Sequence, residues 1–142
     1  MIGGATRGKG GWNLGAHLSD RNQKNDETRP GSSRGLIEDG VKNQIKELTN
    51  IGKFSSHSKP LYHVHADPSI QYTPQQWGKY WQNFEKEFKL DKQPFSEVYH
   101  VKNGREHVHR VYSLVKNNGS CIRMDNDFVR REKLNRLAEL EN

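Results

Sequence analysis

The sequence predicts one α+β domain, and three features of the chain carry this prediction. Two extended runs meet at Asn103-Gly104, a helix with a complete start signal follows Thr73, and a short extended run stops at Asp67-Pro68. With 142 residues, the chain is long enough for one compact core and too short for two domains of ordinary size. We therefore expect a single domain over residues 1–142.

The first 35 residues are expected to contribute little regular structure. They hold eight of the 13 glycines and six basic residues, with few apolar residues between Leu14 and Leu36. Because such a segment cannot bury a face of its own, we expect residues 1–35 to form one short element and partly mobile loops.

A helix is predicted to begin near Leu36 and to end near Gly52. Apolar residues in this range recur at intervals of four, four and three, the spacing of one helical face: Ile37, Val41, Ile45 and Leu48. A polar loop closed by Pro60 follows this helix. The run from Leu61 to Ala66 then predicts a short strand that Asp67-Pro68 terminates.

The helix expected after Thr73 has the clearest signals in the sequence. Thr73 and Gln76 match a capping box, and Pro74 occupies the first helical turn, where its missing N–H is not needed. Four aromatic side chains recur at intervals of four, three and four: Trp77, Trp81, Phe84 and Phe88. This spacing predicts an aromatic stripe buried in the core rather than a surface that stacks bases.

Two strands are predicted at about Phe95–Lys102 and Arg105–Lys116. The Asn103-Gly104 pair between them is a strong hairpin signal, because both central positions of the tight turn require positive φ. After a second turn and a brief extended piece near residues 121–124, a charged helix is expected to start near Asp125. Its apolar residues are Leu134, Leu137 and Leu140.

Composition limits the classes of function. The formal net charge is +6 and the pI about 9.5, values that favour a polyanionic partner such as a nucleic acid. No run of about 18 apolar residues and no signal-like start is present, so we expect neither a membrane span nor a secretory signal. The single cysteine, Cys121, can form no internal disulfide, which fits a reducing compartment, and we expect a cytoplasmic protein.

Three of the seven histidines are predicted to converge on one patch. If Asn103-Gly104 is a two-residue turn, His100 lies opposite His107, and the alternation of side chains along a strand puts His109 on the same sheet face. Opposed Cβ atoms lie about 4.5–5.5 Å apart, close enough for three rings to reach one ion at about 2.1 Å. One interpretation is a divalent-metal site with open positions, suited to polarising a phosphate or a water. The other is a set of strand histidines without an ion, either partly exposed or joined by hydrogen bonds.

The same segment resembles the metal-binding motif of relaxases, the mobilisation nucleases of conjugative DNA transfer. In that motif a His-hydrophobe-His pair on a strand has a third histidine seven residues before it, as His100 precedes His107-Val108-His109. The stretches Lys59–Pro68, Gln76-Trp77 and Arg34–Leu36 are also similar to the family in order and spacing. The resemblance covers nearly the whole chain.

The resemblance implies an HUH-endonuclease-like fold, in which helices flank a central antiparallel β-sheet and the metal lies on one sheet face. It implies a divalent ion, Mn or Mg, as cofactor and single-stranded DNA at a transfer origin as partner. Accessory transfer proteins are further candidate partners. Relaxases usually continue into other regions, whereas this chain stops after the nuclease-like part, so a shortened relaxase is one expectation.

The nucleophile of this family lies near the N-terminus and is tyrosine in many members and histidine in a subset. Residues 1–61 contain no tyrosine, but Asn13–Leu18 resembles the N-terminal motif with His17 in the position of the nucleophile. A neutral imidazole can attack without a general base, whereas a tyrosine, with a pKa of about 10, needs one. The resemblance therefore implies His17 as the catalytic residue, and a plain surface histidine is the alternative.

Seven further residues are candidate DNA contacts, chiefly through phosphate, which sets affinity and register without reading sequence. Two cations flank the hairpin turn, three N-terminal cations are expected to border His17, and two histidines share one face of the strand at 61–66. The set comprises Arg7, Lys9, Arg34, His63, His65, Lys102 and Arg105. For each cation the alternative is solvated surface charge. For the two histidines a structural or DNA-contacting role is favoured over a second metal site.

The function predicted from these residues and the resemblance is metal-dependent, site- and strand-specific nicking and rejoining of DNA at a plasmid transfer origin. This transesterification would initiate conjugative mobilisation through a covalent 5′-phosphohistidyl intermediate. One alternative is a non-catalytic or truncated DNA-binding accessory protein. Another is a replication-initiator or transposase nuclease with the same histidine pair, although such enzymes carry a tyrosine on a later helix and the helix expected from Asp125 has none.

Overall fold

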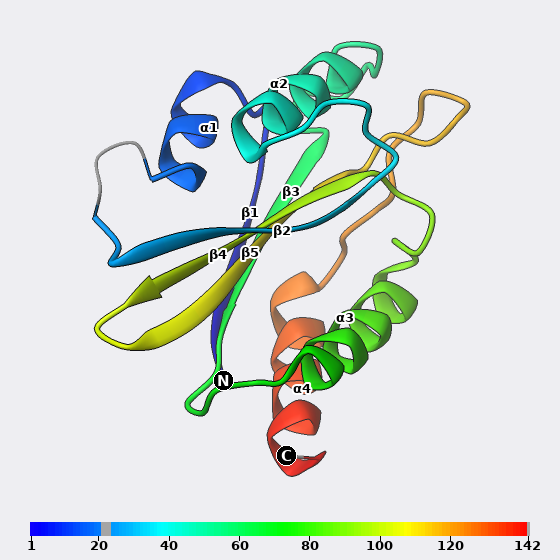
Figure 1. Cartoon of the computed structure of the whole chain (residues 1–142). Coiled ribbons are helices and arrows are strands. Elements are labelled where there is room, and N and C mark those ends of the chain that lie inside the picture. Colours follow the sequence, from blue (N-terminus) through cyan, green and yellow to red (C-terminus); the bar gives the residue numbers. More distant parts are fainter. Residues whose placement is uncertain (21–23, 142) are drawn as a thin grey trace.

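The computed structural model describes residues 1–20 and 24–141, which form a five-stranded antiparallel sheet and four helices (Figure 1). The strand order across the sheet is β1-β3-β5-β4-β2. In chain order the elements are β1 (Ile2–Gly8), α1 (Trp12–Leu18), β2 (Glu27–Arg34), α2 (Val41–Gly52), β3 (Leu61–Asp67), α3 (Pro74–Phe88), β4 (Phe95–Lys102), β5 (Arg105–Ser113) and α4 (Asp127–Glu141). The predicted α+β class with a central antiparallel sheet is confirmed.

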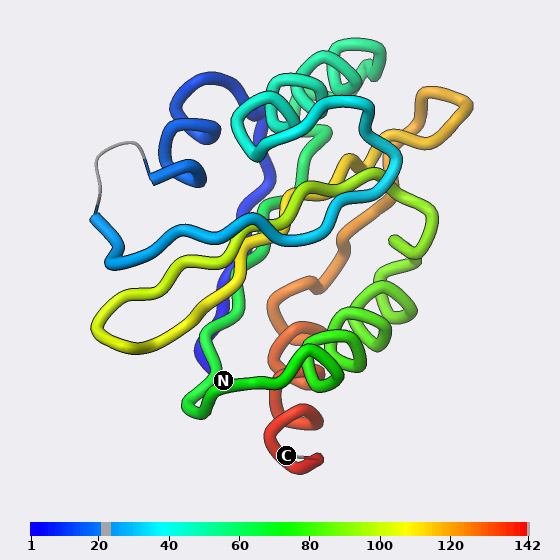
Figure 2. The backbone as a smooth tube through the Cα atoms, viewed as in Figure 1, coloured from blue at the N-terminus to red at the C-terminus, as the bar shows by residue number. Residues whose placement is uncertain are grey.

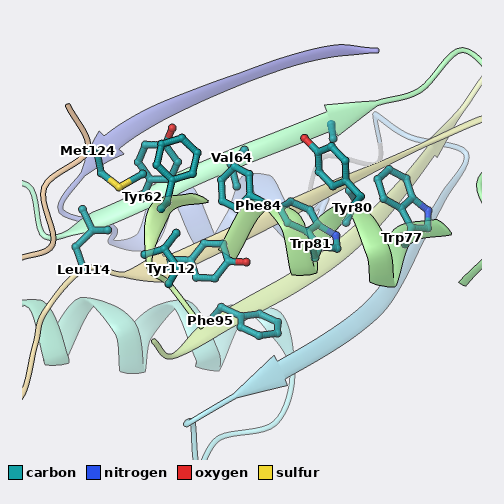
Figure 3. Packing of buried hydrophobic residues seen from close by; sticks show 14 of the residues in the cluster. Tyr62, Val64, Trp77, Tyr80, Trp81, Phe84, Phe95, Tyr112, Leu114 and Met124 are labelled. Atoms are coloured by element: carbon teal, nitrogen blue, oxygen red, sulfur yellow. The ribbon is translucent and has the colours of Figure 1, made fainter. Parts of the chain in front are cut away.

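The helices form two layers, one on each face of the sheet. In the backbone trace, α1 and α2 lie over one face, and α3 and α4 lie over the other (Figure 2). The larger apolar cluster fills the α3 and α4 side, where aromatic rings of α3 pack on Tyr62 and Tyr112 of the sheet (Figure 3). A smaller cluster lies under α1 and α2 and contains Leu18, Ile45, Leu48, Leu61, Val98 and Val111. No helix of the described chain is both long and apolar enough to cross a membrane.

Helix α3 follows its sequence signals closely. The Thr73 side chain accepts the backbone N–H of Gln76, and the Gln76 side chain accepts the N–H of Thr73, so the predicted capping box is complete. All four aromatic residues of the predicted stripe are buried. The stripe therefore belongs to the core, as predicted, because burial of these rings is what attaches α3 to the sheet.

Helix α2 begins at Val41, five residues later than predicted. Gly40, with φ 82°, occupies the N-cap, and Ile37 is 93% exposed in the preceding turn. The carboxylate of Glu47 accepts the backbone N–H groups of Ile37 and Glu38, which holds that turn outside the helix. The predicted apolar face is confirmed for the buried residues Ile45 and Leu48, but its first residue, Ile37, lies outside the helix.

The hairpin has the predicted register. Asn103 and Gly104 have φ values of 54° and 75°, the positive pair that a tight I′ turn requires. Strand β5 ends at Ser113 rather than at Lys116, and beyond it Val115 forms only an isolated bridge with Cys121. The final helix is also present, and two of its leucines, Leu137 and Leu140, are exposed.

The N-terminal segment is more regular than expected. Residues 1–35 supply both edge strands and α1, because β1 pairs with β3 and β2 pairs with β4. The prediction of one short element is wrong: the central strands offer unpaired backbone groups that a glycine-rich strand can satisfy without burying side chains. Residues 21–23 lie outside the described residues. Helix α1 lies between these two strands in the chain and on the same side of the sheet as α2 (Figure 1). Its residues His17 and Leu18 contact the histidines of that sheet face.

A buried charged network anchors β5 on the opposite face. Arg110 pairs with Glu85 of α3 and Glu97 of β4, and its guanidinium carbon lies 4.4 Å from the ring centroid of Trp81. Buried charges are tolerated when each is paired and hydrogen-bonded. Because Arg110 directly follows His109, the network fixes the register of β5 at the point where the histidines lie.

Candidate metal and nucleic-acid site

Three histidines converge on one face of the central hairpin. His100 pairs with His107 across the strands, and His109 pairs with Val98, so all three side chains share that face as predicted. One ring nitrogen from each lies within 4.8 Å of the others. Ring centroids are 4.7 Å apart for His100 and His109 and 5.0 Å for His107 and His109. The predicted convergence is confirmed.

Hydrogen bonds aim two of these rings. His100 Nε2 lies 2.8 Å from the backbone oxygen of Leu18, so it carries the proton that the carbonyl accepts and leaves Nδ1 with a free lone pair. His109 Nδ1 lies 2.9 Å from His63 Nε2. The other nitrogen of His109, Nε2, is buried and has no hydrogen-bond partner in the part of the chain that the structure describes. A buried nitrogen without a partner, beside two further imidazole nitrogens, fits a divalent-metal site.

Two histidines of β3 complete the cluster. His65 pairs directly with His109, and His63 lies on the same face two residues earlier. The β1 strand makes room for them at Gly4, where an added Cβ would lie 2.7 Å from the His65 ring. The sequence put both histidines on one strand face, but their approach to His109 depends on the long-range pairing of β3 with β5.

Burial lowers the pKa of four histidines of the cluster. Desolvation lowers the pKa of His63 to about 4 and lowers the pKa of His65, His107 and His109 below the ordinary imidazole value. Neighbouring histidines add to the effect at His63, His107 and His109, and the Arg131 cation adds to it at His65. Neutral imidazoles keep the lone pairs that bind metal ions. Of the three proposed ligands, His107 and His109 are therefore ready to bind a metal ion at neutral pH.

His17 reaches this cluster from α1. Its ring centroid is 5.9 Å from that of His109 and 6.2 Å from that of His100, and its side chain is exposed to the cleft. The hydrogen bond from His100 to Leu18 ties α1 down beside His17 itself. At the start of the helix, the Gly11 N–H donates to Thr49 Oγ1 of α2. The structure thus brings together the predicted nucleophile and the predicted metal ligands.

All six of these histidines line one cleft of about 560 Å³. Its rim carries the cations Lys24 and Lys102 and the carboxylates Asp20 and Asp67. Lys102 is exposed there, in a position to meet a phosphate, and Arg105 sits next to the rim with its guanidinium 3.0 Å from Asp67. Lys102 therefore lines the cleft and Arg105 lies beside it, and contact of either cation with DNA stays a prediction.

The three N-terminal cations lie elsewhere, and the expectation that they border His17 is wrong. Arg7 donates to the backbone oxygen of Lys59, and its pairing with Tyr62 turns it toward the opposite sheet face. Lys9 lines a separate groove at the end of α2.

Arg34 is a structural residue on the α3 side of the sheet. It donates to both carboxylate oxygens of Glu85 and to the backbone oxygens of Leu90 and Gln93. The sequence around Arg34 could not reveal these partners, because Glu85 lies on α3, far along the chain. A guanidinium with this many internal partners has little left for a phosphate.

Comparison with known protein families matches residues 18–142 to "Relaxase: MobA/VirD2-like, nuclease domain". The chain belongs to this family. The relaxase match starts at Leu18, one residue after His17, and includes every histidine of β3, β4 and β5. A search of the curated proteins finds no match. Membership of the relaxase nuclease family supports a DNA nuclease, and the histidine cluster is compatible with the metal on which such a nuclease would depend.

Proposed function

We propose that the chain nicks and rejoins one DNA strand at a plasmid transfer origin in the cytoplasm, with His17 as nucleophile. The observation that carries the proposal is the position of the His17 ring, about 6 Å from His109 and His100 in a single cleft. Attack on a phosphate held by the cluster requires this proximity. Accessory transfer proteins at the same origin remain candidate partners.

The reaction balances without water or an external energy source. The lone pair of His17 attacks phosphorus, a P–N bond forms, and the bond from phosphorus to the 3′ oxygen breaks. The other ring nitrogen of His17 gives up its proton, the 3′ oxygen takes up a proton and leaves as a free hydroxyl, and the 5′ phosphate stays on the imidazole. Attack by a second 3′ hydroxyl reverses these steps and rejoins the strand. A divalent ion, Mn or Mg, held by His100, His107 and His109 would draw negative charge from the non-bridging phosphate oxygens.

The tyrosines offer no competing nucleophile. Four of the five are buried in the α3 side of the core: Tyr62, Tyr72, Tyr80 and Tyr112. The fifth, Tyr99, lies on that same sheet face, with the guanidinium of Arg29 4.7 Å from its ring centroid. None of them lines the histidine cleft within the described chain. This distribution favours histidine chemistry.

The test is covalent capture on labelled single-stranded oligonucleotides containing a transfer origin, with and without manganese. We expect a metal-dependent protein–DNA adduct that mild acid cleaves, because a P–N bond to histidine is acid-labile. His17→Ala should abolish the adduct, and His57→Ala, at an exposed histidine outside the cluster, should retain it on an oligonucleotide short enough to occupy only the cleft.

Three outcomes would count against the proposal. An adduct that survives mild acid, or one that forms in His17→Ala, would remove His17 as the nucleophile. DNA binding with no adduct at all under any metal condition would instead support a non-catalytic accessory protein.

A further inference from the structure

A stripe of lysines along α2 lines a groove other than the histidine cleft. Lys42 and Lys46 lie on α2, and Lys53 is its C-cap residue with helical dihedral angles. Their intervals of four and seven place all three on one side of the helix. All three are exposed, and within residues 1–20 and 24–141 none forms an ion pair. With the polar residues Asn43, Thr49 and Asn50 they line a groove of about 480 Å³ between α2 and α1. The described lining of this groove contains no acidic residue.

Two exposed aromatic side chains stand at the ends of this stripe. Trp12, at the start of α1, is 59% exposed, and its ring centroid lies 4.1 Å from the Lys42 ammonium. Phe54, directly after Lys53, is 87% exposed. Aromatic rings next to exposed cations are the components that bind unpaired bases and their phosphates together.

The basic surface continues beyond α2. A second groove shares Thr49 and Lys53 with the first and adds Lys9 and His57. Lys9, which the sequence placed beside His17, therefore extends the lysine stripe instead.

We propose that the lysine stripe, defined as Lys42, Lys46 and Lys53 with Trp12 and Phe54, binds the single-stranded DNA that flanks the nick site. The inference rests on the proposed function, because it requires a DNA strand in the histidine cleft. Helix α1 connects the two surfaces: His17 lines the cleft, and Trp12 lines the groove. A single DNA strand that leaves the cleft and crosses α1 would next contact the lysine stripe.

The surface selects unpaired rather than duplex DNA. Lys42 and Lys53 are about 16 Å apart along the helix axis, enough for several successive phosphates. Exposed aromatic faces add affinity only when bases are free to stack on them. An acidic protein segment could pair with the lysines but has no bases to stack on Trp12 and Phe54. The two exposed rings therefore favour single-stranded DNA over an acidic protein segment as the partner.

The first assay measures binding of a fluorescent 30-nucleotide single strand by anisotropy, over a range of salt concentrations and without metal. The second assay measures nicking, with metal, of an oligonucleotide short enough to occupy only the cleft. Each phosphate contact to a single strand contributes about 0.7 to the slope of log K against log salt. The variant Lys42→Ala/Lys46→Ala/Lys53→Ala should therefore reduce the slope by about two. The charge-matched control is Lys86→Ala/Lys92→Ala/Lys133→Ala, at exposed lysines of the opposite side, and it should leave the slope unchanged.

A second variant tests the aromatic part of the surface. Phe54→Ala should weaken binding of the long strand about tenfold and should leave duplex binding unchanged, because base stacking is lost while charge is retained. Nicking of the short oligonucleotide should be normal in both stripe variants.

The outcomes separate the two proposals. If the wild-type chain nicks DNA but the triple lysine variant keeps its full salt slope, the lysine stripe is not the binding surface. If Phe54→Ala binds the long strand normally, the single-strand assignment is wrong. If the wild-type chain neither nicks nor binds DNA, both proposals fail.

Discussion

Replacing His63 should weaken metal binding although His63 is not one of the three ligands. Its Nε2 is the hydrogen-bond partner of His109 Nδ1. When His109 offers Nε2 to an ion, its Nδ1 carries the proton and His63 accepts it. His63→Leu removes the acceptor and leaves a buried N–H without a partner, whereas His63→Gln can place an amide oxygen near the same point.

The expected loss in His63→Leu is about 10- to 100-fold in affinity for manganese, the usual effect of removing an outer-shell partner of a metal ligand. This corresponds to about 1.4–2.8 kcal/mol, which agrees with the cost of about 1–3 kcal/mol for a buried polar group left unsatisfied. His63→Gln should stay within a few-fold of wild type, because it restores the hydrogen bond.

Isothermal titration of the metal-free protein with manganese at pH 7.5 measures these affinities. Thermal unfolding without metal shows whether each variant is folded. Wild-type affinity in folded His63→Leu would refute the reasoning, and so would equal losses in the Leu and Gln variants.

Three further predictions concern stability. Arg110→Met should lose about 3–5 kcal/mol of unfolding free energy in a urea titration, because it leaves the buried Glu97 without its cation and Glu85 with Arg34 alone; a loss below 1 kcal/mol would show that the network is not coupled to stability. Burial lowers the pKa of His63 to about 4, so as the pH falls the unfolded state binds a proton on this imidazole before the folded state does. The contribution of neutral His63 to the free energy of unfolding is fully present above about pH 6.5, and it falls by up to about 3 kcal/mol as the pH decreases to 4. In His63→Leu the free energy of unfolding of the metal-free protein should depend less on pH over this range, and an unchanged slope would contradict the assignment. Gly10→Ala should destabilise the fold by more than about 1 kcal/mol, since Gly10 has φ 81° and an added Cβ would lie 2.3 Å from Thr49 Oγ1; a wild-type melting temperature would argue against this packing.

The sequence predicted those parts of the site that local geometry determines. Asn103-Gly104 fixes the hairpin register, and the register alone places His100, His107 and His109 on one face. The capping box and aromatic spacing determine α3 in the same local way. These predictions needed only neighbours within about a dozen residues.

The remaining parts depend on pairings between distant segments. His63 reaches His109 only because β3 pairs with β5, and residues 1–35 become regular only because the central strands have free edges. The sequence predicts a phosphate contact at Arg34, but this guanidinium is bound by Glu85, which lies 51 residues away. Charge and glycine content carry no information about such partners.

The strand order also determines when the protein can fold during synthesis. Strand β5 lies between β3 and β4, so neither of them has its inner neighbour until residues 105–113 have left the ribosome. Strands β1 and β2 pair only with β3 and β4, so they too wait for the late hairpin to complete the sheet. Contacts this distant in sequence slow folding, and they leave unpaired strands exposed in the meantime. A nascent chain stalled before β5 would therefore present His17 and the β3 histidines without a closed sheet, and it would depend on chaperones to avoid aggregation.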